Sequence, residues 1–223
     1  MNAVNSIIFA LECIAVISFS VSGTVVAIGK RADVFGAVIF SFITTFGGGL
    51  IRDLIIGNHP PLLFVSREYA ILAAICFAVS LTVFLISFAG NIADRLSQNL
   101  HNLLLEGTDM LGLALFCILG VDSAMASAPE IQNNVALLVF CGCITGVGGG
   151  ILRDVFSAQI PLLFRKHVYI IPALLGTACY VLLLPHTERL IAILVSVSII
   201  LILRTLAIRF HWNLPTPLEN NRK

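Results

Sequence analysis

Seven apolar stretches, each close to the length of a membrane-spanning helix, occupy most of this chain. A helix needs about 20 mostly apolar residues to cross the hydrocarbon core of a bilayer. Only 11% of the 223 residues are charged and 58% are hydrophobic, whereas soluble domains carry about 25% charged residues. We therefore predict an all-α integral membrane protein with spans at residues 6–28, 34–57, 69–90, 102–123, 132–157, 168–184 and 190–208.

These spans leave room for one transmembrane domain, residues 1–208, and a polar tail at 209–223 that we expect to be mobile and cytoplasmic. The first stretch lacks a basic start and contains Glu12, so it is interpreted as a retained helix and not as a signal peptide. The cysteines and histidines show no ligand spacing, and we predict no metal and no cofactor. The net charge of +1 does not indicate a nucleic-acid partner.

Lysine and arginine are distributed unevenly over the connections between spans, which sets the expected orientation. On one side of the membrane the basic residues are only Arg67 and Arg189. The other side holds Lys30, Arg31, Arg95, Arg165, Lys166, Arg209, Arg222 and Lys223. Because basic residues accumulate in cytoplasmic connections, we predict an external N-terminus and a cytoplasmic C-terminus.

The chain contains an internal repeat. The sequence GGGLIRDL at 47–54 matches GGGILRDV at 148–155. With one residue removed from the first copy, PLLF at 61–64 matches PLLF at 161–164 and Tyr69 matches Tyr169, and upstream Glu12 matches Asp109. Residues 6–90 and 102–184 thus form two copies of a three-span unit, and the seventh helix, 190–208, stands outside them. An odd number of spans inserts the second copy upside down, so we predict an inverted-topology repeat, an arrangement common among transporters.

The glycine triplets fall inside the second span of each unit, where glycine disfavours a regular helix. Interrupted spans at matched positions indicate a permeation or binding site, although small residues also permit close helix packing. The residues expected to form the helix kinks are Gly47, Gly48, Gly49, Gly148, Gly149 and Gly150. The hydroxyls expected to line a path, or alternatively to pack between helices, belong to Ser41, Thr44, Thr45 and Thr145.

Each triplet is followed by an arginine and an aspartate, and a charge inside a membrane span needs a partner. We expect Glu12 or Asp53 to neutralise Arg52. By the repeat, Asp109 or Asp154 should neutralise Arg153. These groups either gate the two mouths of a pathway or join helices without a further role.

A basic cluster is expected on the cytoplasmic side. It comprises Lys30, Arg31, Arg165 and Lys166. The cluster either sets the topology of the chain or binds an anionic lipid headgroup.

The doubled GGG-x-x-RD motif, the seven spans and the acidic residues Glu12 and Asp109 early in spans 1 and 4 resemble the trimeric intracellular cation (TRIC) channels. The similarity is greatest to their bacterial members, which carry the name glycine-transporter domain, and it covers about residues 5–205. The resemblance implies a homotrimer in the inner cell membrane. In each protomer, kinked spans 2 and 5 would line a pore for potassium and sodium. Span 1 departs from the family pattern of Asp-x-x-Gly, with Glu12 and Ala15, whereas span 4 keeps Asp109 and Gly112.

Two functions remain open on the sequence, a monovalent cation channel and a secondary transporter for glycine or another small amino acid. An enzyme with Asp53 and Asp154 as an aspartyl dyad is not expected. Such a dyad needs its carboxylates within hydrogen-bonding reach, whereas the inverted topology separates these two by about 20 Å of helix rise.

Overall fold

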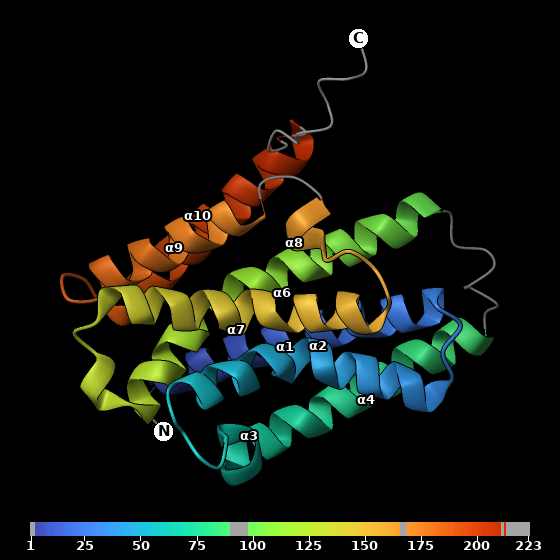
Figure 1. The fold of residues 1–223 in the computed structure, drawn as a ribbon, viewed down its shortest axis with the longest axis horizontal. Coiled ribbons are helices and arrows are strands. Elements are labelled where there is room, and N and C mark those ends of the chain that lie inside the picture. The colour runs from blue at the N-terminus through green and yellow to red at the C-terminus, as the bar shows by residue number, and fades with distance from the viewer. Residues whose placement is uncertain (1–2, 90–97, 166–168, 211, 213–223) are drawn as a thin grey trace.

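The computed structural model describes residues 3–89, 98–165, 169–210 and 212. Over these residues the secondary structure is helical (Figure 1). In chain order the helices are α1 (Ala3–Gly29), α2 (Val34–Ile55), α3 (Leu62–Val65), α4 (Arg67–Ala89), α6 (Gln98–Ser127), η1 (Pro129–Ile131), α7 (Val135–Phe156), α8 (Leu162–Arg165), α9 (Ile170–Leu183) and α10 (Arg189–Arg209).

Within the described residues, six helices are long and apolar enough to span a membrane, namely α1, α2, α4, α6, α7 and α10. The prediction of an all-α membrane protein is confirmed. The expected sixth span corresponds to α9, which has 14 residues and a length of about 21 Å. Pro185 follows its last turn, and a proline disfavours helical geometry in the residue before it. By length, α9 does not reach across a core of about 30 Å, so the seven-span count remains a prediction.

Helices α2 and α7 cross in contact at the centre of the molecule (Figure 1). A Cβ atom added to Gly48 would lie 2.2 Å from the carbonyl oxygen of Thr145, and one added to Gly149 would lie 1.9 Å from the carbonyl oxygen of Thr44. These contact pairs run in opposite directions along the two helices, which are therefore antiparallel. At this distance the backbones touch, and only a residue without a side chain permits such an approach.

The expected interruption of these helices is not observed. Helix α2 continues from Val34 to Ile55 and α7 from Val135 to Phe156, without a break at either triplet. No unwound segment is therefore present at the glycines, and the helix kinks stay a prediction. The reason is tertiary, because each triplet packs directly against the backbone of the other helix. That close contact offsets the low helix propensity of glycine, about 1 kcal/mol per residue.

Further glycines seat the neighbouring helices against this crossing. Gly23 of α1 lies against Thr44, since a Cβ added there would be 2.7 Å from the threonine Oγ1. Gly120 of α6 lies against Thr145 in the same way, at 2.6 Å. Outside this centre, α9 and α10 lie side by side along one edge and α4 lies along the opposite edge (Figure 1). The crossing of α2 and α7 is thus enclosed by α1 and α6.

The middle glycine of each triplet should be the sensitive one. We expect Gly48→Ala and Gly149→Ala to lower the thermal midpoint of the detergent-solubilised protein, because overpacking typically costs about 1–3 kcal/mol. The matched control is Gly49→Ala, whose new Cβ would meet its nearest neighbour, Arg52 Nη2, at 3.8 Å. It should be neutral or stabilising, since alanine favours a helix. Equal losses for Gly48→Ala and Gly49→Ala would contradict the crossing.

Candidate functional site

Arg52 is buried beside its sequence neighbour. Its side chain is 2% exposed, and its Nε and Nη2 donate to Asp53 Oδ1 at 2.9 and 2.7 Å. The other oxygen, Asp53 Oδ2, accepts the backbone N–H of Leu62 at 2.9 Å. Among the described residues Glu12 forms no ion pair with Arg52. Of the two partners that the sequence allows, the structure therefore selects Asp53.

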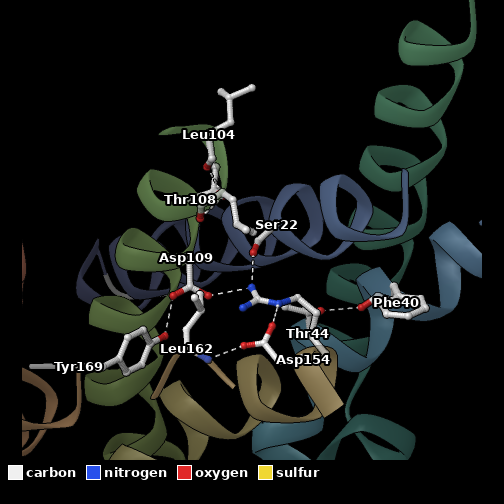
Figure 2. Close-up of polar contacts among 11 residues, drawn as sticks. Ser22, Phe40, Thr44, Leu104, Thr108, Asp109, Asp154, Leu162 and Tyr169 are labelled. Atoms are coloured by element: carbon white, nitrogen blue, oxygen red, sulfur yellow. Dashed lines mark hydrogen bonds and ion pairs between the residues drawn. The ribbon is translucent and has the colours of Figure 1, made fainter. Parts of the chain in front are cut away.

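Arg153 takes both of its expected partners. Its Nε donates to Asp154 Oδ1 at 2.8 Å, and its Nη1 donates to Asp109 Oδ1 at 2.8 Å and to Ser22 Oγ at 2.5 Å. Figure 2 shows Ser22, Asp109 and Asp154 converging on this guanidinium from three helices. Tyr169 extends the group by donating its hydroxyl to Asp109 Oδ2 at 2.6 Å. Below, "the Arg153 network" means Ser22, Asp109, Arg153, Asp154 and Tyr169.

The two RD motifs and the two PLLF segments form one structural unit in each half. Asp154 Oδ2 accepts the backbone N–H of Leu162 at 2.8 Å, as Asp53 does from Leu62. Each motif aspartate thus joins a buried guanidinium to the first residue of a short helix, α3 or α8. A buried charge that loses its partner is strongly destabilising. The same link forms in both halves although the RD and PLLF segments are one residue farther apart in the first copy.

The two halves differ in how far their polar networks extend. Tyr169 reaches Asp109, whereas the hydroxyl of its counterpart Tyr69 lies 3.4 Å from Ser123 Oγ. Glu12, the counterpart of Asp109, accepts no hydrogen bond from Tyr69 among the described residues. The second half is therefore held together by contacts that the first half lacks.

Two cavities lie on the Glu12 side of the crossing. The larger, called the vestibule here, has a volume of about 490 Å³ and is lined by residues that include Glu12, Asn58, Glu68, Asp122 and Arg189. The smaller, called the inner cavity, has a volume of about 30 Å³, enough for one or two waters. Glu12, Tyr69 and Ser123 line both cavities, so the two adjoin.

A narrow hollow marks the opposite side of the crossing, which is called the closed side here. The hollow there is lined by residues that include Val147, Gly150, Arg153, Asp154 and Tyr169. It is too small to hold a water molecule. This hollow among the described residues is thus smaller than the vestibule and the inner cavity.

The predicted site residues separate into three groups. Those that line the inner cavity are Glu12, Thr45, Gly49, Arg52, Asp53 and Thr145. Those at the helix crossing are Gly47, Gly48, Gly148 and Gly149. Those on the closed side are Asp109, Gly150, Arg153 and Asp154.

Of the four predicted hydroxyl residues, two line the inner cavity and two are buried away from the cavities. Thr45 and Thr145 line the inner cavity, while each donates its hydroxyl to the carbonyl oxygen four residues earlier. Ser41 and Thr44 are fully buried. Ser41 lies 3.3 Å from Cys76 Sγ, and Thr44 donates to the carbonyl oxygen of Phe40 at 2.6 Å. Neither Ser41 nor Thr44 lines the cavities described above.

The predicted basic cluster is only partly visible. Lys30 and Arg31 are exposed between α1 and α2, where Arg31 adopts a left-handed backbone conformation with φ of 59°. The side chain of Arg165 and all of Lys166 lie outside the described residues, as does most of the predicted tail. A lipid-headgroup role for this cluster stays a prediction.

The sequence reasoning missed two buried charges. Asp122 accepts hydrogen bonds from the Tyr180 hydroxyl and from Arg189, whose Nη2 lies 2.8 Å from Asp122 Oδ2. Arg204 of α10 is 4% exposed. An ionisable residue within an apolar span is a signal of function by default, and that rule applied to spans 4 and 7 would have found both.

The two motif aspartates should differ in their importance for stability. We expect Asp53→Asn to lower the thermal midpoint more than Asp154→Asn. Among the described residues Asp53 is the one carboxylate paired with Arg52, whereas Arg153 keeps Asp109 and Ser22. Breaking a buried pair costs about 3–5 kcal/mol. Loss of the monodisperse size-exclusion peak on heating measures this, and equal losses would contradict the assignment.

Comparison with known proteins places the chain in a family. The family model described as "Glycine transporter" matches residues 9–87 and again residues 107–185. Over 218 residues the chain is 32% identical to a UPF0126 membrane protein of Vibrio cholerae, covering 95% of this chain and 83% of that one. It is 31% identical to the UPF0126 inner membrane protein YadS of Escherichia coli K12, covering 94% and 96%.

Solved structures agree with the sequence matches. A TRIC cation channel studied for its conductance superposes with a TM-score of 0.76 at 31% identity, covering 93% of this chain and 95% of that one. A prokaryotic TRIC channel gives a TM-score of 0.80 at 28% identity, with 94% and 100% covered. The TRIC orthologue from Rhodobacter sphaeroides gives 0.79 at 27%, with 92% and 98% covered. The chain therefore belongs to the glycine transporter family, as a bacterial member of the TRIC family.

Proposed function

We propose that this protein is a monovalent cation channel whose path runs through each protomer, past the crossing of α2 and α7. The observation that carries the proposal is the acidic vestibule, which narrows at Glu12 into an inner cavity lined by both of these helices. The similarity to proteins described as TRIC cation channels supports the same function.

The charges of the vestibule favour cations over anions. Three carboxylates line it, those of Glu12, Glu68 and Asp122, against one arginine. Arg189 pairs with Asp122. Among the described residues neither Glu12 nor Glu68 has an ion-pair partner, so the lining keeps excess negative charge. Carboxylates at the mouth of a pore raise the local concentration of cations.

The inner cavity extends the proposed path from the vestibule toward the crossing of α2 and α7. Thr45 and Gly49 of α2 and Thr145 of α7 line it. Beyond it, the backbones of α2 and α7 touch at Gly48 and Gly149. An ion passes only if these helices separate there. We therefore place the movable constriction at the two triplets, where α2 and α7 meet as continuous helices.

The antiparallel contact of α2 with α7 supports an inverted repeat of the two three-helix units. We further propose that the chain assembles as a homotrimer in the inner membrane. The name of the Rhodobacter sphaeroides relative describes that protein as trimeric, and the name of YadS describes that protein as an inner membrane protein. The distribution of Lys and Arg supports a vestibule that faces the outside.

Recording from the purified protein in planar bilayers, beside uptake of labelled glycine into proteoliposomes, tests the proposed function. We expect single-channel potassium and sodium currents and no saturable glycine uptake. A channel passes ions far faster than the conformational cycle of a carrier, which takes microseconds to milliseconds or longer. Saturable glycine uptake without unitary currents would replace the channel by the alternative, a secondary transporter for glycine or another small amino acid.

Glu12→Gln tests the role of the vestibule. A unit charge about 5 Å from a cation in water contributes about 0.8 kcal/mol, so unitary potassium conductance should fall about fourfold. The reversal potential in a potassium chloride gradient should also move toward zero. Glu130→Gln is the matched control, because Glu130 is an exposed carboxylate of η1 that lines neither cavity. Unchanged conductance and selectivity in Glu12→Gln would exclude a path past Glu12.

A further inference from the structure

Arg204 is the buried charge that the proposed path does not use. It lies on α10 with a side chain 4% exposed. Its Nε and Nη1 are buried and donate to no acceptor among the described residues. Burying donors without partners is costly. The contact that the structure does give this guanidinium is with an aromatic ring, since its Cζ lies 4.2 Å from the centroid of Tyr169.

Tyr169 connects Arg204 to the closed side of the molecule. Its ring is the surface on which Arg204 stacks, and its hydroxyl donates to Asp109 at 2.6 Å. Asp109 in turn accepts from Arg153. A cation over the face of a tyrosine ring is attracted by the ring, more strongly when water is excluded. Arg204 therefore favours the ring position from which the Tyr169 hydroxyl reaches Asp109.

The charges of the buried side chains also group Arg204 with the Arg153 network. The buried acids on this side are Asp109 and Asp154, and the buried arginines are Arg153 and Arg204. With Arg204 included, the two negative charges are matched by two positive charges. The helix that supplies Arg204 is anchored nearby, because Thr205 Oγ1 lies 3.7 Å from Met110 Sδ, next to Asp109.

Among the described residues, the first half of the molecule has no arginine stacked on Tyr69 as Arg204 is on Tyr169. Helix α10 stands outside the duplicated unit, so Tyr69 has no repeat-related arginine. The Tyr69 hydroxyl lies near Ser123 and not on Glu12. The side with Tyr69 contains the vestibule and the inner cavity, whereas the hollow beside Tyr169 has no room for a water. The difference between the halves thus coincides with the presence of Arg204.

We propose that Arg204 is a positioning residue that holds one mouth of the path closed, by stacking on Tyr169 and so keeping the Arg153 network assembled. Helix α10 is then the part of the fold that makes the two mouths unequal. Opening of this mouth requires the Tyr169 ring to leave Arg204. This inference rests on the proposed channel function.

Single-channel recording of Arg204→Gln tests the proposal. We expect the ratio of open to closed time to rise roughly three- to tenfold, within the range that a partly desolvated cation–π contact supplies. Unitary conductance should not change, because Arg204 lines none of the described cavities. Arg204→Lys keeps a cation near the ring and should return the ratio toward wild type. Arg209→Gln, an exposed arginine on the same helix, is the control and should match wild type.

A double-mutant cycle separates positioning from a general effect on folding. Tyr169→Phe keeps the ring but removes the hydroxyl, so it should raise the open ratio by itself. In that background Arg204→Gln should add little, because both act through one hydrogen bond to Asp109. Additive effects would overturn the proposal. If Arg204→Gln does not fold, Tyr169→Leu replaces it, and an unchanged open ratio in that variant would equally overturn the proposal.

The test of the positioning role of Arg204 can be distinguished from the test of the channel function. Wild-type currents with an unchanged open ratio in Arg204→Gln would overturn the role of Arg204 and leave the channel intact. Absence of wild-type currents would overturn both. A change in unitary conductance with an unchanged open ratio would place Arg204 in the path itself and would also refute the positioning role.

Discussion

The contact between the backbones of α2 and α7 is the constraint on which the rest of the structure depends. With Gly48 against Thr145 and Gly149 against Thr44, two helices in the core of a membrane protein approach until their main chains touch. In lipid no hydrophobic effect drives one helix onto another, so such close van der Waals contact is a principal source of association. The seats of α1 and α6 follow from it, because Gly23 and Gly120 pack onto the threonines of the crossing.

The crossing also determines where the two motif arginines, Arg52 and Arg153, lie. Each arginine lies four residues beyond the middle glycine of its own triplet, and the helices run in opposite directions, so Arg52 and Arg153 fall on opposite sides of the contact. Burial then requires a carboxylate for each of them. The adjacent aspartate meets that need in both halves and fixes the following short helix by its second oxygen. A motif of sequence neighbours thus becomes a link between two helices.

Duplication predicts equal halves, and the structure departs from equality at a few residues. Asp109 is bonded by Arg153 and Tyr169, whereas Glu12 faces two cavities. The two side chains also differ in length, because the carboxylate of Glu12 stands one methylene farther from its backbone than that of Asp109. Helix α10 adds Asp122–Arg189 contacts on one side and Arg204 on the other. The unrepeated helix α10 thus contributes different contacts to the two halves of the duplicated unit.

The sequence by itself determined the membrane setting, the helical class, the duplicated unit and the family, because each depends on apolar length, residue order or motif spacing. It also limited the partners of Arg52 and Arg153 to two acids each. Only the tertiary structure decided that Asp53 and not Glu12 pairs with Arg52, that the triplets stay helical, and that Arg204 meets Tyr169. These outcomes depend on which backbone lies opposite a residue. Local propensity does not contain that information, because the glycines that weaken an isolated helix are the ones that let two helices touch.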